Sequence, residues 1–315
     1  MAAKGNTKII YAALIANFAI AVTKFAASAF TGSSAMFAEA IHSVVDTGNQ
    51  GLLLFGLRQA KRPPSEAHPF GHGKDLYFYA FCVAIVIFGA GAGFSAYEGI
   101  EKLRHPGEIS SPYVNYIVLA IAFAFESYAW SMAFRAFQAA RGDMGFFEAV
   151  HRSKDPTLFT VLFEDSAAML GLVIAFLGVL ITSITGNVLY DALATLGIAA
   201  VLAATAVLLA IETKGLLVGE GADPKLVSAL RAQIAAAPGV TRVNELLTMH
   251  FGPNEILLTA SVDFDDSLGA DDVEAAVARL NTSIRSAHPD VKRLFIEAQD
   301  RASHRQNALG ADIGV

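Results

Sequence analysis

The sequence predicts an all-α bundle of six transmembrane helices followed by a small α+β domain. Three observations predict this fold class. Hydrophobic residues make up 54% of the 315 residues and charged residues 17%, and the mean hydropathy of +0.47 is too high for an ordinary soluble domain. Six apolar windows are each long enough to cross the roughly 30 Å of hydrocarbon in a bilayer. The residues after about 213 are instead polar and periodic, as in a soluble domain.

The six predicted spans alternate across the membrane and give the chain an orientation. The basic residues near their ends fall on one side, which the positive-inside rule assigns to the cytoplasm together with both termini. The first span is about twenty residues long and no small-residue cleavage pattern follows it, so we expect it to stay on the chain. The spans cover about 9–30, 35–57, 77–100, 113–137, 157–182 and 188–211, and the basic residues are Lys4, Lys8, Arg58, Lys61, Arg62, Lys74, Arg135, Arg141, Arg152 and Lys154.

The C-terminal part is predicted to be a separate cytoplasmic domain. Alternation in "EILLTASVDF" and the turn in "FGPNE" indicate strands, and "SLGADD" offers capping carboxylates for a helix. The expected elements are a helix at 224–237, strands at 240–250 and 255–264, a helix at 270–287 and a strand at 291–298, an αββαβ order that suggests an open-faced sheet. We therefore place the transmembrane domain at 1–213, a linker at 214–223, the cytoplasmic domain at 224–300 and a disordered tail at 301–315.

Composition and motifs exclude several functions. From residue 215 on, the chain has 9 Lys and Arg against 14 Asp and Glu, and this acidity argues against a nucleic-acid partner. The same segment contains no Gly-rich phosphate loop and no nucleophile elbow. The single cysteine, Cys82, excludes a disulfide framework within the chain and a thiolate metal cage. We do not expect an enzyme.

The second span carries a stripe of polar residues. Within "AEAIHSVVDTGNQGLLLFG" (38–56), Glu39, His42, Asp46 and Asn49 follow one another at spacings of three, four and three. These steps return to nearly the same side of an α-helix. An ionisable group at mid-bilayer costs several kcal/mol unless it is paired or faces a wet cavity. The stripe is therefore expected to face something polar.

Other spans place carboxylates at a similar depth. Asp46 and Glu126 each lie about eleven residues from the inner end of their span, and Asp165 lies roughly 12 Å above the same boundary. A histidine with carboxylates at this spacing suits a borderline divalent cation such as Zn²⁺, because imidazole nitrogen and carboxylate oxygen both bind it at about 2.0–2.2 Å. A proton relay, or a hydrogen-bonded pair that only holds the bundle together, would use the same residues.

Two polar residues of the first span lie level with this stripe. Asn17 is predicted beside Asp46 and Asn49, where it could hydrogen-bond the site or bridge helices. Lys24 lies at nearly the depth of Glu39. Its ammonium could snorkel to the headgroups, whereas a pair with Glu39 would neutralise both charges.

Longer motifs resemble those of a known family. "SSAMFAEAIHSVVDTGNQ" (33–50) and "HPFGHGK" (68–74) are similar to the cation diffusion facilitator family, and the likeness runs from Asn17 through the C-terminal domain. "DPTLFTVLFEDSAAMLG" (155–171) resembles the branch that includes the mitochondrial zinc transporters of animals, which carries Glu-Asp in the fifth span. The resemblance implies a homodimeric transporter that exchanges Zn²⁺ or a related ion for protons, with a cytoplasmic domain of the copper-chaperone or ferredoxin-like αββαβ type.

The resemblance also implies a set of metal ligands. It places the ion between His42 and Asp46 of the second span and Asp165 of the fifth. Val161 stands where the family usually has a histidine, so a ligand must come from elsewhere, first from Glu164 and then from Glu126. Asn17 and Glu39 are further candidates near this site, and His68 and His72 match a loop where a second cation can bind.

The predicted function is proton-coupled export of divalent cations by alternating access. Zn²⁺ is the first expectation, and the oxygen-rich ligand set leaves Fe²⁺ and Mn²⁺ open. We expect an integral membrane protein of a bacterial inner membrane, a homodimer through both domains, with metal ion, protons and lipid as partners. The alternatives are a membrane-anchored metal sensor and an intramembrane zinc hydrolase, the latter without a His-Glu-x-x-His motif to support it.

Overall fold

The chain divides into two units. The computed structural model describes residues 2–32, 34–105 and 112–311. One unit comprises Met1–Arg62 and Asp75–Lys214, and the other comprises Pro63–Lys74 and Gly215–Val315. The boundary near residue 214 lies close to the predicted one. The loop at Pro63–Lys74 differs, because it groups with the C-terminal residues although its sequence position lies between two spans.

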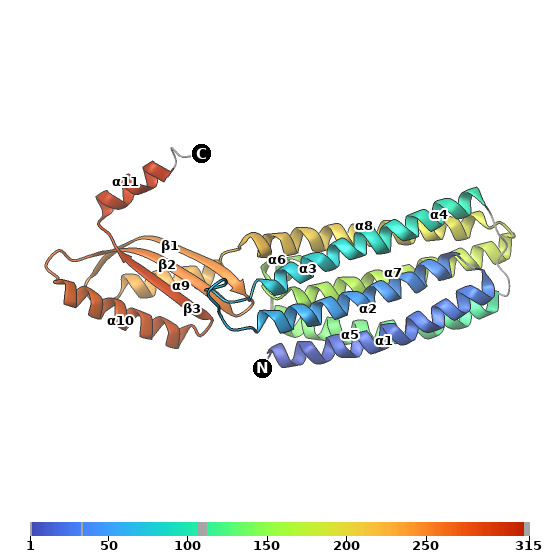
Figure 1. Ribbon diagram of the computed structural model, residues 1–315, viewed down its shortest axis with the longest axis horizontal. Coiled ribbons are helices and arrows are strands. Elements are labelled where there is room, and N and C mark those ends of the chain that lie inside the picture. Colours follow the sequence, from blue (N-terminus) through green and yellow to red (C-terminus); the bar gives the residue numbers. More distant parts are fainter. Residues whose placement is uncertain (1, 33, 106–111, 312–315) are drawn as a thin grey trace. The chain divides into compact units, whose positions relative to one another are not determined.

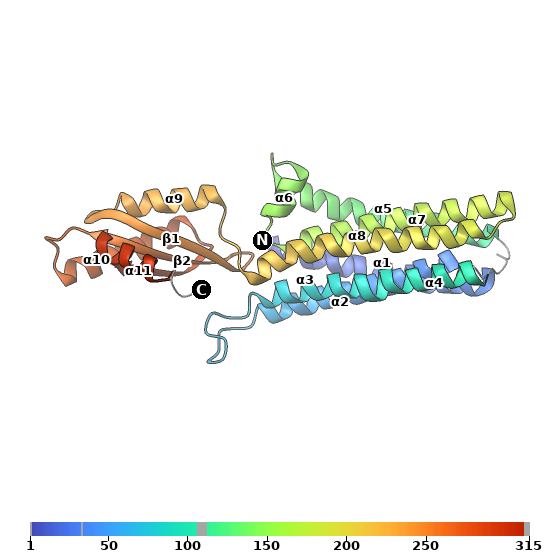
Figure 2. The same ribbon diagram turned by 90° about the horizontal axis from the view of Figure 1, so that it is seen from above.

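The first unit is a bundle of long helices that run side by side (Figures 1 and 2). The third predicted span is one continuous run in which a π-helical segment, η1, interrupts the α-helix. A short helix, α6, which the sequence analysis did not predict, precedes α7. The elements are α1 (Ala2–Thr31), α2 (Ser34–Ala60), α3 (Asp75–Val86), η1 (Ile87–Gly93), α4 (Phe94–Arg104), α5 (Pro112–Arg141), α6 (Phe146–Arg152), α7 (Pro156–Thr185) and α8 (Leu189–Val218).

Length and composition mark these helices as membrane spans. Within the described residues, four runs are long and apolar enough to cross a bilayer: Asp75–Arg104, Tyr113–Arg141, Pro156–Thr185 and Leu189–Val218. Helices α1 and α2 are 30 and 27 residues long, and they pack against these runs. The polar stripe makes α2 less apolar than its neighbours. A six-helix transmembrane bundle is thus confirmed as the fold of this unit.

Four helices form a closed ring of contacts that surrounds the polar stripe. Helix α1 packs on α2, α2 on α7, α7 on α5, and α5 back on α1. Local sequence fixes the ends of α7: Pro156 occupies its first turn, and the Asp155 side chain accepts a hydrogen bond from the Thr157 backbone N–H. Gly186, with a φ of 69°, ends this helix in the left-handed conformation that glycine adopts without strain.

The second unit contains the predicted αββαβ domain. Its elements are α9 (Pro224–Ala235), β1 (Val240–Gly252), β2 (Glu255–Phe264), α10 (Ala270–Ala287), β3 (Val291–Ala298) and α11 (Arg301–Ala311). The strand order is β1-β2-β3, with β2 antiparallel to β1 and parallel to β3. The crossover through α10 permits this parallel pairing.

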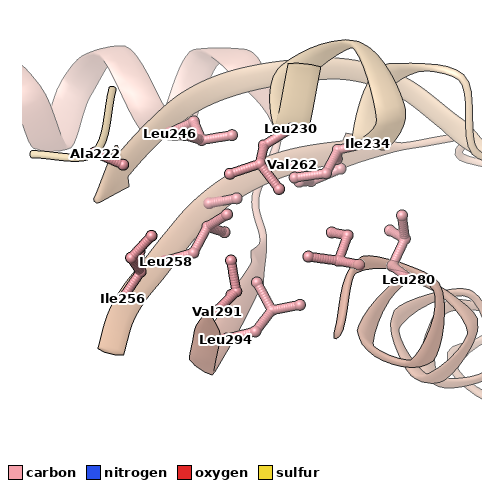
Figure 3. Packing of buried hydrophobic residues seen from close by; sticks show 12 residues of the cluster. Ala222, Leu230, Ile234, Leu246, Ile256, Leu258, Val262, Leu280, Val291 and Leu294 are labelled. Carbon is pink, nitrogen blue, oxygen red and sulfur yellow. The ribbon is translucent and has the colours of Figure 1, made fainter. Parts of the chain in front are cut away.

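A single apolar core holds this domain together. Leu230 and Ile234 of α9 and Leu280 of α10 pack against Leu258 and Val262 of β2, and all five are at most 4% exposed (Figure 3). Both helices therefore cover one face of the sheet with their apolar sides. This arrangement is the open-faced sheet that the element order suggested.

The loop at Pro63–Lys74 packs against the same domain. The ring of Phe70 stacks on that of Phe251 with centroids 5.1 Å apart. A guanidinium N–H of Arg293 donates to the Pro69 carbonyl oxygen over 3.3 Å. Aromatic stacking and this hydrogen bond explain why the loop belongs to the second unit.

The segment after residue 300 corrects one prediction. Residues 301–315 were expected to be disordered, whereas Arg301–Ala311 forms helix α11, and residues 312–315 lie outside the described residues. Asp300 caps this helix, because its Oδ1 accepts from the backbone N–H groups of Ala302 and Ser303. Hydrogen bonds from Ser303 also hold the pKa of Asp300 below its usual value. The polar composition had concealed this local cap.

Candidate metal-ion site

The polar stripe of α2 faces the interior of the helical unit. Glu39, His42, Asp46 and Asn49 are each at most 1% exposed, whereas Val44, on the opposite side of the helix, is 47% exposed. This burial follows from the four-helix ring, which encloses that side of α2. The stripe therefore lies among helices, with its polar atoms removed from lipid.

Helix α7 brings two carboxylates to the same interior. Glu164 and Asp165 are each 1% exposed. The Asn49 side-chain amide donates to Glu164 Oε1 over 2.6 Å, which links the stripe of α2 directly to α7. Asp46 and Glu164 are close enough to interact electrostatically. We refer to His42, Asp46, Glu164 and Asp165 as the carboxylate cluster.

The polar atoms of the carboxylate cluster are poorly satisfied. His42 Nε2 lies 3.4 Å from Asp46 Oδ2, but the pair does not align as a hydrogen bond. Several atoms of the cluster have no hydrogen-bond partner among the described residues: both His42 ring nitrogens, both Asp46 oxygens, Glu164 Oε2 and Asp165 Oδ2. Buried polar groups are normally paired, and leaving one unpaired costs about 1–3 kcal/mol. The cluster is therefore suited to a partner that is not part of the chain.

A second polar group lies toward the N-terminal end of α2, where a lysine pairs with one oxygen of Glu39 and the other, Oε1, has no hydrogen-bond partner among the described residues. Lys24 Nζ of α1 lies 2.9 Å from Glu39 Oε2 and donates to Ser43 Oγ over 3.0 Å. Lys24 and Glu39 are fully buried, so of the two alternatives left open by the sequence the structure forms the ion pair, and Lys24 does not snorkel. Gly171 of α7 makes room for Glu39, since a Cβ there would overlap Glu39 Oε1. We refer to Lys24, Glu39 and Ser43 as the lysine cluster.

Two further predicted residues lie inside the ring of four helices. Glu126 of α5 is fully buried, neither of its oxygens has a hydrogen-bond partner among the described residues, and its charge acts on Asp46 and Asp165. Asn17 of α1 is 1% exposed, and its Oδ1 also lacks such a partner. Both residues therefore add unsatisfied polar atoms to the interior that holds the carboxylate cluster.

Gln50 is a buried residue of this region that the sequence did not single out. Gln50 is fully buried, and neither end of its amide has a hydrogen-bond partner in the described part of the chain. It follows Asn49 directly, outside the three-and-four spacing that identified the stripe. An uncharged polar residue inside an apolar span was the available signal.

The cluster is not a closed metal cage in this conformation. Among the described residues, no three His, Cys, Asp or Glu side chains gather closely enough to hold an ion. The histidines of the Pro63–Lys74 loop belong to the second unit, where the rings of His68 and His72 lie 4.4 Å apart between centroids. They form a separate pair rather than an extension of the carboxylate cluster.

Comparison with known proteins identifies the family. The model of the cation efflux transmembrane domain matches residues 10–218, two thirds of the chain. The chain belongs to the cation efflux, or cation diffusion facilitator, family. The match includes every residue of the carboxylate and lysine clusters. It establishes an integral membrane protein of a transporter family and gives the intramembrane hydrolase hypothesis no support.

Curated relatives of the chain come from animals, plants and bacteria. It is 36% identical over 265 residues to "Proton-coupled zinc antiporter SLC30A9, mitochondrial" of Xenopus laevis, covering 83% of this chain and 47% of that protein, and equally identical to the human one, of which 46% is covered. It is 27% identical to "Cation-efflux pump FieF" of an Escherichia coli strain over 85% of this chain and 90% of that protein. The chain spans about half the length of the SLC30A9 relatives. Their mitochondrial names do not support the bacterial inner membrane that we expected.

Proposed function

We propose that this protein is a proton-coupled antiporter of divalent metal cations, with Zn²⁺ as its first substrate. One observation carries the proposal: a buried histidine and three buried carboxylates from α2 and α7, with unsatisfied oxygens and nitrogens, lie within one ring of helices. The names of its relatives, a proton-coupled zinc antiporter and a cation-efflux pump, describe the same chemistry.

The proposed ligands come from two helices. His42 and Asp46 of α2 bind the ion with Asp165 of α7, and Glu164 supplies the position that a histidine usually fills. Because no three of these side chains form a cage in the described conformation, the ion must draw them together. Glu126 on α5 is the alternative fourth ligand, since its carboxylate is equally unsatisfied.

Proton coupling follows from the chemistry of these ligands. An imidazole nitrogen or a carboxylate oxygen binds a metal ion only when it carries no proton. Protons and metal ions therefore compete for the same lone pairs, and each ion that enters displaces protons. Exposure of the site to one side of the membrane at a time then converts this competition into antiport. The protein needs no separate proton path.

The first experiment measures ion flux through single-residue variants. The full chain is reconstituted into liposomes that contain a pH-sensitive dye, and a Zn²⁺ gradient is applied. We expect His42→Ala and Asp46→Ala each to abolish zinc-driven proton movement. His105→Ala is the matched control, because this histidine is 75% exposed and contacts only the Glu101 side chain among the ion pairs found in the described residues. Undiminished flux in both site variants would remove the proposed mechanism.

The identity of the ion is tested by competition. One imidazole with two or three carboxylates forms a harder, more oxygen-rich site than a histidine-rich zinc site, which favours Mn²⁺ and Fe²⁺ as competitors. Zn²⁺ flux is measured while Mn²⁺, Fe²⁺, Co²⁺ or Cd²⁺ is added to the outside. We expect each of these ions to inhibit Zn²⁺ flux less than excess unlabelled Zn²⁺ does. Stronger inhibition by Mn²⁺ than by excess unlabelled Zn²⁺ would assign the site to manganese.

The remaining features of the proposal concern assembly and orientation. We propose a homodimer with both termini in the cytoplasm, as the basic residues and the family resemblance imply. Cysteine accessibility tests the orientation, since a cysteine introduced at Ser303 should react with an impermeant reagent only in inside-out vesicles. Labelling of right-side-out vesicles would reverse the topology.

A further inference from the structure

A cavity of about 160 Å³ lies where α5 ends, α6 folds back and α7 begins. It lies in the helical unit, on the side of the bilayer to which the basic residues of the chain are assigned. The carboxylate cluster contributes none of its lining. The lining residues are Phe137, Ala140, Arg141, Met144, Ala149, Arg152, Ser153 and Leu158.

Arg141 gives this cavity its positive charge. Its Nε is buried and has no hydrogen-bond partner among the described residues. A buried donor of a charged group without an acceptor costs more than the 1–3 kcal/mol typical of a neutral group. An arginine fork matches the oxygens of a phosphate or carboxylate in a bidentate manner. The unsatisfied Nε therefore indicates an anion that is not part of the chain.

The second arginine of the cavity is partly engaged. Arg152 Nη2 lies 3.2 Å from Glu148 Oε1, one turn earlier on α6, and their side chains are 39% and 50% exposed. Such exposed pairs are worth about 0–1 kcal/mol, so Glu148 is a weak competitor for an incoming anion. The nearby Asp143 is exposed in the turn that joins α5 to α6 and does not line the cavity.

Two aromatic residues begin helix α6. The ring of Phe146 packs against Phe137 with centroids 5.1 Å apart, whereas Phe147 is 78% exposed. Exposed aromatic rings such as that of Phe147 are enriched at the membrane interface. Apolar groups at this position suit an acyl chain better than they suit a soluble anion.

We propose that the cavity binds the phosphate headgroup of an anionic phospholipid in the cytoplasmic leaflet. Arg141 would hold the phosphate oxygens, Arg152 would add a second charge, and the acyl chains would lie along Phe147. Basic pockets between transmembrane helices on this side of a membrane bind such headgroups in other proteins. This inference is independent of metal transport, because it concerns residues outside the carboxylate cluster.

The test measures lipid retention by variants of the full chain. Purified protein is titrated with phosphatidylglycerol or phosphatidylcholine, and bound lipid is counted by native mass spectrometry without metal. We expect Arg141→Gln to weaken phosphatidylglycerol binding about tenfold, since it removes a hydrogen bond to a charged group. Arg135→Gln is the matched control: this arginine lies on the same helix, is exposed and does not line the cavity. Equal losses in both variants would show only diffuse attraction and overturn the proposal.

Two further arms make the result decisive. Inorganic phosphate and glycerol phosphate are added as competitors. Displacement of the lipid by either anion, at a concentration near that anion's own Kd for the protein, would assign the cavity to a soluble anion. If Arg141→Gln fails to fold, Met144→Trp fills the cavity without removing a charge. Loss of phosphatidylglycerol selectivity in that variant supports the site, whereas unchanged selectivity overturns it.

Discussion

The lysine cluster and the carboxylate cluster have the same burial, but only the lysine cluster contains a cation paired with its carboxylate. In the lysine cluster, Glu39 pairs with Lys24 at 2.9 Å and Ser43 accepts from the same ammonium. In the carboxylate cluster, one turn away, His42 and Asp46 have no aligned partner among the described residues. Burial alone therefore does not distinguish a structural polar group from a functional one. The two clusters differ instead in whether a cation of the chain lies beside the carboxylate.

The source of positive charge explains this difference. Lys24 is a cation of the chain, so Glu39 is neutralised permanently and the pair ties α1 to α2. The carboxylate cluster contains three carboxylates and one imidazole, and within it no lysine or arginine is present. An exchangeable ion or protons must neutralise it.

The largest expected effect comes from breaking the lysine cluster. Lys24→Met leaves Glu39 buried without its cation, which should cost about 3 kcal/mol of stability. The double variant Lys24→Met with Glu39→Leu removes both charges, and should recover most of this loss. Thermal unfolding of the detergent-solubilised protein, monitored by size exclusion, measures both. Additive losses in the double variant would contradict a coupled ion pair.

The carboxylate cluster should respond in the opposite way. Asp46→Asn removes a carboxylate that forms no ion pair with a lysine or arginine among the described residues, so stability should not fall, while Zn²⁺ affinity should fall at least about 100-fold because a direct ligand is lost. Isothermal titration calorimetry measures the affinity, and thermal unfolding the stability. Glu39→Gln is the matched control from the lysine cluster, and it should lower stability more than affinity. A reversed pattern would exchange the roles of the two clusters.

The hydrogen bond between α2 and α7 should have a smaller effect. Asn49→Leu removes the donor to Glu164 Oε1, so the carboxylate loses its orientation and Zn²⁺ affinity should fall about tenfold. Gln50→Leu is the control, because this neighbour is equally buried but its amide makes no hydrogen bond to the described residues. If Gln50→Leu lowers the affinity as much, packing of α2 rather than the Asn49 amide positions the ligand.

The smallest expected effect is a gain. Val161 is 2% exposed on α7, one turn before Asp165, at the position where the family resemblance implies a histidine. Val161→His adds a nitrogen ligand to an oxygen-rich set. The ratio of Zn²⁺ affinity to Mn²⁺ affinity should therefore increase by a factor of up to about ten. Competitive binding of the two ions measures this ratio. Leu162→His places the ring on a different side of the helix, and an equal gain there would argue against a ligand position at 161.

Periodicity in the sequence was sufficient for most of the fold. Strand β2 was predicted at 255–264 and observed at Glu255–Phe264, and helix α10 was predicted at 270–287 and observed at Ala270–Ala287. Apolar alternation and a capping segment are local signals, so these elements could be found. Helix α6 was missed because its seven residues are too few to show a helical period. The start of α11 was missed because it depends on a single capping residue, Asp300.

The candidate site was predicted only in part. The spacing of Glu39, His42 and Asp46 placed all three on one side of α2, which the burial of these residues agrees with. It ranked Glu39 among the ligands, although Lys24 engages it in the folded bundle. It placed Glu126 at the depth of Asp46, and the ring of helices brings the two carboxylates close enough to interact electrostatically. These relations depend on which helices are neighbours.

The sequence by itself determined which residues share a side of each helix, because the α-helical period is a property of the backbone. Only the tertiary structure decided that Lys24 neutralises Glu39 while His42 and Asp46 lack such a partner. The physical reason is that a charge interaction depends on distance in space, and residues 15 positions apart in the chain come within 2.9 Å only when α1 and α2 pack together.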